Sequence, residues 1–233
     1  MRCVTTMDKK QLTKLITYFT LGDGGVYYSG KECRFVMNML EKNRDYIEWV
    51  ASVLQEVTGT SVRSVDDVRE GRKPTLNITT KTHPFFTNLR DRIYIDGYKG
   101  IDPHSLKLLD WESLAILYMC DGSLYTDKPN PKKGLVNNSY SVTLNMKRLS
   151  YGDQFILKKA LKEHLGLEWN IQRGGNYYFL RLRGKDLQTF MEGVAPYIKE
   201  SFSYKLVRTI GSVKTDGDIV CSTQECVETN RND

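Results

Sequence analysis

Two aspartates occupy matching positions in this 233-residue chain and could bind a metal ion together. Asp23 and Asp121 each follow an apolar, helix-like run and precede a glycine. The C-terminal end of a helix carries partial negative charge, so a carboxylate there is disfavoured by roughly 0.3–1 kcal/mol. A bound divalent cation removes this conflict, because Mg²⁺ prefers oxygen ligands such as carboxylates. A single Asp-Gly pair would be read as a helix-ending turn, but its repetition favours a shared metal site.

Each half of the chain also closes on a Tyr-Lys pair, which supplies one lysine to each aspartate. These lysines are Lys99 and Lys205. In phosphodiester hydrolysis a metal activates a water molecule and neutralises the leaving oxygen. The lysines could then stabilise the developing negative charge or position the water. The alternative for each is a solvated surface charge without a role in catalysis.

The elements that must position these residues recur in the same order in both halves. Asn38 precedes Lys99 by 61 residues, and Asn145 precedes Lys205 by 60, so the two halves are in register. Helical periodicity and alternation predict helix, two strands, helix, two strands and helix in each half. The predicted helices and later strands span 11–25, 45–57, 61–68, 75–81 and 84–95 in the first half, and 114–122, 152–165, 168–173, 177–183 and 185–198 in the second.

The first helix of each half differs in its apolar pattern. The first copy has one apolar face, whereas the run 114–120 is apolar without a break, which predicts a helix buried on all sides. Asp8 and Asp110 are the predicted N-caps. Of the residues three positions further on, Gln11 fits a capping box and Ser113 does not.

The predicted fold class is α+β, with two pseudo-symmetric αββαββα halves. Their boundaries are 1–104 and 105–211, followed by a polar tail at 212–233. Apolar and polar residues alternate along the strands, so each antiparallel sheet should have one face under helices and one open polar face. The loop 127–136, which is basic and rich in turn-forming residues, is the main insertion in the second half.

The open faces carry Thr, Ser, Asn, Gln, Lys and Arg with few acidic residues, which favours DNA contact over an ordinary solvated surface. A two-stranded ribbon fits the major groove, where Asn, Gln and Arg pair with base edges and Lys with phosphates. The predicted DNA-binding residues are Arg34, Asn38, Arg72, Lys73, Thr75, Asn77, Thr79 and Lys81 in the first half, and Lys132, Lys133, Ser139, Ser141, Thr143, Asn145, Lys147, Gln172, Arg181 and Arg183 in the second.

The charge and composition of the chain are consistent with an intracellular protein that binds a negatively charged partner. The formal charge is +6 and the pI is near 8.9. No run of residues is apolar enough to predict a membrane span, and five scattered cysteines predict reduced thiols rather than disulfides or a zinc site. Three tyrosines just beyond the first helices are predicted to lie in the sheet core, with base stacking or phosphate contact as the alternative: Tyr27, Tyr28 and Tyr125.

The segments ITYFTLGDG (16–24) and LAILYMCDG (114–122) resemble the two signature helices of the LAGLIDADG homing endonucleases. The resemblance covers residues 8–206. The second copy matches the motif at Leu114, Ala115, Leu117, Asp121 and Gly122, and the first rests on Gly22, Asp23 and Gly24. The chain departs from the motif in bulky Tyr18 and Ile116, where small residues often let the helices approach, and in Leu21 and Met119, where the consensus has an acid.

This resemblance implies a monomer in which the signature helices form the interface and the sheets form a saddle over double-stranded DNA. It implies cleavage of both strands across the minor groove, leaving 3′ overhangs. Mg²⁺ or Mn²⁺ would be the cofactor, and Ca²⁺ would bind without supporting cleavage. Asp23 and Asp121 would be the metal ligands, assisted by the carbonyls of Gly22 and Cys120, with Lys99 and Lys205 as catalytic basic residues.

The functional hypothesis is therefore a site-specific double-strand DNA endonuclease, encoded within an intron or as a free-standing mobile gene. A start at methionine without flanking splicing blocks argues against an intact intein. The alternative is an intron RNA maturase or a non-cleaving DNA-binding protein on the same scaffold. Retention of both Asp23 and Asp121 favours the enzyme.

Overall fold

The computed structural model describes residues 7–68, 71–127 and 139–206. The predicted tail at 212–233, and the predicted DNA contacts Lys132 and Lys133, lie outside the described residues. The first half contains one four-stranded antiparallel sheet of order β1-β2-β4-β3. Its elements are α1 (Lys9–Leu21), β1 (Gly25–Ser29), β2 (Glu32–Leu40), α2 (Arg44–Thr58), β3 (Ser64–Asp67), β4 (Thr75–Thr79) and α3 (Pro84–Ile93).

The second half repeats this arrangement, with a four-stranded sheet of order β7-β8-β10-β9. The repeat confirms the predicted α+β fold of two αββαββα halves. The elements of this half are α5 (Trp111–Asp121), β7 (Gly122–Asp127), β8 (Ser139–Leu144), α6 (Tyr151–Leu165), β9 (Asn170–Gly174), β10 (Tyr177–Arg183) and α7 (Asp186–Val194).

Short elements join the halves and end the described chain. The two-stranded hairpin β5 (Tyr94–Ile95) and β6 (Tyr98–Lys99) and the helix α4 (Pro103–Leu106) precede α5. The remaining elements are 3-10 helices: η1 (Glu41–Asn43), η3 (Ala195–Tyr197) and η4 (Glu200–Lys205). None of the described helices is long and apolar enough to cross a membrane.

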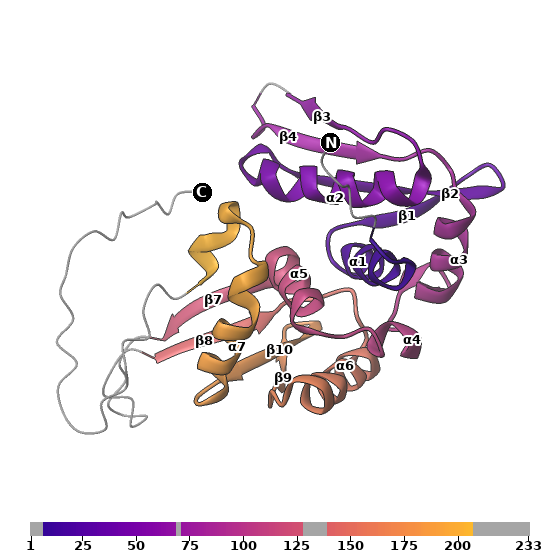
Figure 1. Ribbon diagram of the computed structural model, residues 1–233. Helices are drawn as coiled ribbons and strands as arrows, with labels where there is room; N and C mark the ends of the chain where they lie inside the picture. The colour runs from indigo at the N-terminus through magenta and orange to yellow at the C-terminus, as the bar shows by residue number, and fades with distance from the viewer. Residues whose placement is uncertain (1–6, 69–70, 128–138, 207–233) are drawn as a thin grey trace.

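Helix α1 and helix α5 lie side by side at the junction of the two halves, with one sheet on each side of them (Figure 1). As predicted, α5 is buried on all sides: every residue from Leu114 to Met119 is at most 1% exposed. The two helices approach closely at their C-terminal ends. A Cβ atom added to Gly22 would lie 2.7 Å from the Cys120 Sγ atom. Gly22 therefore supplies the small residue that Tyr18 and Ile116 do not.

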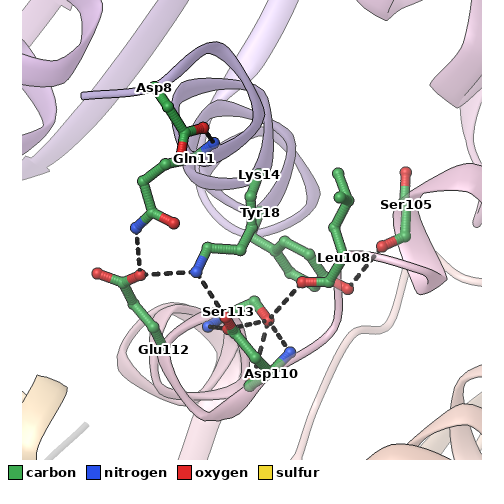
Figure 2. Close-up of polar contacts among 9 residues, drawn as sticks. All are labelled: Asp8, Gln11, Lys14, Tyr18, Ser105, Leu108, Asp110, Glu112 and Ser113. Atoms are coloured by element: carbon green, nitrogen blue, oxygen red, sulfur yellow. Dashed lines mark hydrogen bonds and ion pairs between the residues drawn. The ribbon is translucent and has the colours of Figure 1, made fainter. Parts of the chain in front are cut away.

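Tyr18 fits the interface by pointing its hydroxyl at the segment before α5. It is fully buried, and its Oη donates a hydrogen bond of 3.0 Å to the Ser105 carbonyl (Figure 2). Tyr118 in α5 makes a similar bond of 2.7 Å to the Lys205 carbonyl. The hydroxyl groups of Tyr18 and Tyr118 therefore hold in place the segments that pack around the helix pair.

Both predicted N-caps are confirmed, but the capping box was assigned to the wrong helix. The Asp8 carboxylate accepts from the Gln11 backbone N–H at 2.8 Å, and Asp110 accepts from Ser113 at 2.9 Å. The reciprocal bond forms at Asp110, whose N–H donates to Ser113 Oγ at 2.7 Å. The Gln11 side chain instead donates to Glu112 at 2.7 Å (Figure 2). The Gln11 side chain thus bonds to Glu112 of the other helix and not to the backbone N–H of its own N-cap.

Each half also contacts the other beyond the central helices. The η4 segment packs on α2, where the rings of Tyr46 and Phe202 meet edge to face at 5.5 Å. The Ser201 N–H donates to the Asp45 carboxylate at 3.1 Å. These contacts bring the end of the second half over the first half.

Two predicted helices end earlier than their sequence patterns indicate. The helix predicted at 84–95 ends at Ile93, because Tyr94 and Ile95 pair with β6 in a hairpin. The helix predicted at 185–198 ends at Val194, and the chain continues as a 3-10 turn that contains Pro196. Proline disfavours continuation because it has no N–H to donate.

Candidate active site

Asp23 and Asp121 line the same open cavity, of about 390 Å³, at the C-terminal ends of α1 and α5. Asp23 follows the end of α1, and Asp121 is the last residue of α5. The predicted proximity of the two carboxylates is therefore present in the structure. The other lining residues are Leu21, Gly22, Lys99, Cys120, Gly122, Ser123, Asn145, Met146, Lys147, Arg148 and Leu149.

Glycines after the aspartates let each helix turn directly into a strand. A Cβ atom on Gly24 would lie 2.5 Å from the Phe35 ring, and one on Gly122 would lie 2.0 Å from the Tyr118 ring. Neither position has room for a side chain. The Asp-Gly sequence thus places each carboxylate at the point where a signature helix passes into the first strand of its sheet.

The pKa values of both carboxyl groups are raised, although Lys99, Lys205 and Arg148 lie close enough to oppose the change. Burial, and then the negative charge of Asp23, raise the pKa of Asp121 to about 6. The surrounding protein also raises the pKa of Asp23 by excluding part of the water around its carboxyl group, although the residue is exposed and the positive charges of Lys99 and Lys205 oppose this change. Within the described residues neither aspartate forms an ion pair. The raised pKa values therefore follow first from the exclusion of water around the carboxyl groups, and at Asp121 also from the negative charge of Asp23.

The donor set fits a divalent cation of the magnesium type. Mg²⁺ commonly takes one or two carboxylates and completes its coordination with water and phosphate oxygens. Within the described part of the chain no three His, Cys, Asp or Glu side chains gather in a metal-binding group. Two carboxylates would therefore be the protein's main ligands here. The Gly22 carbonyl, which the resemblance implies as a further ligand, already accepts a hydrogen bond of 2.9 Å from Lys99 Nζ.

The two predicted lysines are buried, which rules out the alternative of solvated surface charges. Lys99 and Lys205 are each 8% exposed. Lys99 Nζ donates to the carbonyls of Gly22 at 2.9 Å and Gly24 at 2.6 Å. Lys205 Nζ donates to the carbonyls of Tyr118, Met119 and Gly122 at 3.0, 2.7 and 2.8 Å. Each lysine therefore satisfies carbonyls at the end of the signature helix of its own half.

The two lysines differ in their relation to the cavity. Lys99 lines it, whereas the described lining residues do not include Lys205. Burial, and then the positive charge of Arg148, lower the pKa of Lys99 to about 8. Burial also lowers the pKa of Lys205. Both lysines thus bond to carbonyls at a helix end, but they differ in access to the cavity: Lys99 lines it, and Lys205 is not among its described lining residues.

The open face of the first sheet presents its predicted contacts largely as expected. Arg34 and Asn38 are exposed, whereas Cys33 and Phe35 on the other face of β2 are fully buried. Asn38 Nδ2 donates to Asn77 Oδ1 at 2.5 Å on the neighbouring strand. The exposed members of the predicted set also include Arg72, Lys73, Thr79 and Lys81, whereas Thr75 and Asn77 are half-buried.

On the second sheet two predicted contacts are buried. Ser141 is 0% exposed and Thr143 is 2% exposed. Arg181, from the neighbouring strand β10, donates to Ser141 Oγ at 2.8 Å and covers it. Both residues are therefore placed to support other side chains rather than to touch a ligand. Of the remaining members, Arg183 and Lys147 are exposed, Asn145, Gln172 and Arg181 are half-buried, and the side chain of Ser139 is outside the description.

The prediction that Tyr27 and Tyr125 lie in the sheet core is wrong. Tyr27 pairs with Arg34 and Tyr125 pairs with Ser141, which places both rings on the open faces. They are 50% and 47% exposed. Each tyrosine follows the aspartate of its half by four residues. This repetition was the available signal that they belong with the candidate site.

Tyr28 is also outside the core, but on the other face of the strand. It is 57% exposed, and the guanidinium of Arg90 lies 4.8 Å from the centre of its ring. A further residue that sequence reasoning missed is Arg148, which lines the cavity and is exposed. Its positive charge acts on both aspartates and opposes the rise in their pKa values.

The profile of the LAGLIDADG DNA endonuclease family matches residues 15–190. The chain belongs to this family. The match begins within α1 and ends within α7, so it includes both signature helices and both four-stranded sheets. The Asp-Gly sequences and the helix pair described above are therefore the LAGLIDADG motifs of this chain.

Two curated relatives share part of the sequence. The uncharacterized protein MJ1098 of Methanocaldococcus jannaschii is 32% identical over 130 residues, which cover 55% of this chain and 47% of that protein. A protein of Mycolicibacterium flavescens named RecA is 26% identical over 214 residues, covering 89% of this chain and 49% of that protein. The chain spans about half the length of these relatives.

Solved structures of LAGLIDADG proteins share the fold. The homing endonuclease I-WcaI, bound to its DNA recognition sequence, superposes with a TM-score of 0.70 at 24% identity and covers 88% of this chain and 89% of that chain. The LAGLIDADG meganuclease I-AabMI, bound to uncleaved DNA, gives a TM-score of 0.53 at 13% identity, with coverage of 80% and 84%.

Proposed function

We propose that this LAGLIDADG protein is a site-specific endonuclease that cuts both strands of double-stranded DNA. Cleavage would depend on Mg²⁺ or Mn²⁺, take place across the minor groove and leave 3′ overhangs. The observation that carries the proposal is the pair of carboxylates, Asp23 and Asp121, in one cavity without ion-pair partners among the described residues. Such a pair is costly for the free protein and is relieved by a divalent cation.

The residues around the cavity have separate roles in this proposal. Asp23 and Asp121 would hold the cation through their carboxylate oxygens. When bound, a divalent cation supplies a more acidic water molecule and neutralises charge on the leaving oxygen. Arg148 and Lys147, which are exposed beside the aspartates, attract the scissile phosphate. Lys99 fixes the carbonyls on either side of Asp23 and so holds this carboxylate in place.

The open faces of the two sheets are the proposed surface for DNA. Arg34 and Tyr27 lie side by side on the first sheet, and Tyr125 and Arg181 lie on the second. Arginine reads guanine edges or contacts phosphates, and tyrosine contacts the backbone. In support, I-WcaI was solved with its DNA recognition sequence. We further propose that the protein acts intracellularly as a monomer, encoded in an intron or as a free-standing mobile gene.

The choice of cation rests on the donor set and on the relatives. Two structures of I-DmoI variants with target DNA were determined in the presence of 2 mM Mg or Mn, and these superpose on the chain with a TM-score of 0.50. Carboxylate oxygens also bind Ca²⁺. We therefore propose Mg²⁺ or Mn²⁺ as the active cofactor, and Ca²⁺ as a cation that binds without supporting cleavage.

The experiment is linearisation of supercoiled plasmids that carry the uninterrupted chromosomal sequence at the gene's insertion point. The wild-type protein should linearise this plasmid with Mg²⁺ and leave it intact in EDTA. Asp23→Asn and Asp121→Asn should each abolish linearisation. Asp96→Asn, in the β5–β6 hairpin, is the matched control and should cut normally, because Asp96 is exposed and lies outside the cavity lining.

Two outcomes would contradict the proposal. Undiminished cleavage in both aspartate variants would show that the carboxylate pair is not the active site. Tight binding to this DNA, without cleavage in either Mg²⁺ or Mn²⁺, would support the alternative of a non-cleaving DNA-binding protein.

A further inference from the structure

Lys14 and Glu112 occupy equivalent positions in the two signature helices. Lys14 lies nine residues before Asp23, and Glu112 lies nine residues before Asp121. In the structure the two residues form an ion pair between α1 and α5, with Lys14 Nζ at 2.9 Å from the Glu112 carboxylate (Figure 2). Two positions that the internal repeat makes equivalent therefore carry opposite charges and meet.

Neighbouring groups reinforce this contact. Lys14 Nζ also lies 2.5 Å from the carboxylate of Asp110, and the Gln11 amide donates to Glu112 at 2.7 Å. The side chains of Lys14 and Glu112 are only 10% and 19% exposed. Charges so far removed from water are strongly destabilising when their partner is lost or reversed.

The internal repeat shows which charges would meet if the halves of different chains were paired in other ways. An interface between two copies of the same half would be related by a twofold axis, so a position that now meets its equivalent in the other half, as Lys14 meets Glu112, would meet its own copy. Two first halves from different chains would bring Lys14 near Lys14. Two second halves would bring Glu112 near Glu112, with Asp110 beside each. Only a first half paired with a second half places opposite charges together.

We propose that the Lys14–Glu112 ion pair selects the partner of each signature helix. The surface of α1 that carries Lys14 fits the α5 surface of a second half and rejects a second copy of α1. This role is distinct from cleavage. Nine helical residues span roughly 13 Å, so the pair lies well away from the aspartates along the helices, and it lines no part of the cavity among the described residues.

The test uses two full-length variants, Lys14→Glu and Glu112→Lys, each refolded alone and as an equimolar mixture. Alone, each variant places like charges at the junction of its own halves. In the mixture, the first half of either variant finds an opposite charge on the second half of the other. We expect the mixture to contain at least about tenfold more dimer than either variant alone, measured by native mass spectrometry.

Controls separate partner selection from simple stabilisation. Lys10→Glu makes the same charge change on an exposed residue of α1 and should give no dimer when mixed with Glu112→Lys. A single chain with both Lys14→Glu and Glu112→Lys should return to the oligomeric state and melting temperature of the wild type. If one variant refolds poorly alone, its soluble yield should recover in the mixture.

A mixture whose dimer content only equals that of the separate variants overturns the proposal. It does so even if both variants melt at lower temperature, because the ion pair would then stabilise the junction without selecting a partner. Equal dimer formation with the Lys10→Glu control would overturn it as well, because any added negative charge on α1 would then suffice.

Discussion

At the scale of single residues, the site holds two carboxylates in surroundings that disfavour their charged forms, chiefly by excluding water. The pKa of Asp121 is near 6 in the folded protein, against 3.8 for an ordinary aspartate. The folded protein therefore binds this proton more tightly than the unfolded chain does. Below pH 4 both states are protonated and the residue costs nothing. The cost grows as the pH rises from 4 to 6, and it is fully present above pH 6.

Asp121→Asn should therefore stabilise the metal-free protein while it abolishes cleavage. A shift of about two pKa units corresponds to at most roughly 3 kcal/mol. The melting temperature in EDTA at pH 7 should rise, and its difference from the wild type should shrink as the pH falls from 6 to 4. Identical melting temperatures at pH 7 would show that burial and the neighbouring Asp23 do not penalise the charged form of Asp121.

Substitution of the two buried lysines should distinguish a purely structural role from a role in cleavage. Lys99→Met and Lys205→Met each remove a donor from buried carbonyls, and each carbonyl left without another donor costs about 1–3 kcal/mol. Both variants should melt at lower temperature. Lys99→Met should also lower the cleavage rate more strongly, because Lys99 lines the cavity. Equal rates in the two variants, after correction for the folded fraction, would argue against a direct role for Lys99.

The aspartates and lysines could be predicted from the sequence because they recur in register. Arg148 could not, because the residue three positions beyond Asn38, which corresponds to Arg148 three positions beyond Asn145, is Glu41. Its location depends on the turn after β8, which brings it into the cavity lining. A residue that only one half supplies to the cavity leaves no trace in an internal repeat.

At the scale of elements, the helix pair depends on one close contact. The order of helices and strands could be predicted because polar and apolar residues alternate cleanly, as on β2. The exact ends and the capping box could not, because they depend on tertiary partners: β6 pairs with Tyr94, and Glu112 binds the side chain of Gln11. The close approach at Gly22 could likewise not be predicted, because it depends on how α1 and α5 pack against each other.

Gly22→Ala should therefore push α1 and α5 apart. Its Cβ atom would lie 2.7 Å from the Cys120 Sγ atom, and such overpacking typically costs about 1–3 kcal/mol. Urea denaturation would measure this loss. Gly152→Ala is the control: it lies in α6, where a Cβ atom meets only Ser150 Oγ at 3.6 Å, and alanine favours a helix. Equal stability of the two variants would contradict the close helix contact.

At the scale of the whole molecule, the two sheets offer their open faces as a joint surface. Alternation along β8 predicted that Ser141 and Thr143 belong to this surface. It could not predict their burial, because the covering side chain, Arg181, comes from β10 and reaches its place only when the sheet forms. The faces of Tyr27 on β1 and Tyr125 on β7 could not be predicted for a related reason: the sequence of so short a strand does not show which of its faces is buried.

DNA affinity should depend on the open faces and not on the outer helices. Arg34→Ala should weaken binding and reduce the slope of log affinity against log salt by about one, as expected for one lost phosphate contact. Lys159→Ala, on the exposed side of α6, should change neither quantity. Fluorescence anisotropy at several salt concentrations would measure both. A similar effect of the two substitutions would place the DNA elsewhere.

The cavity is not symmetric, although the halves are. Among the described residues, its lining beyond the helix ends comes from the second half, through Ser123 and the segment from Asn145 to Leu149, whereas the first half adds Lys99 alone. The two strands of a duplex would therefore meet different chemical surroundings and should break one after the other. An early time point of the plasmid reaction should contain open circles with one interrupted strand, which later become linear.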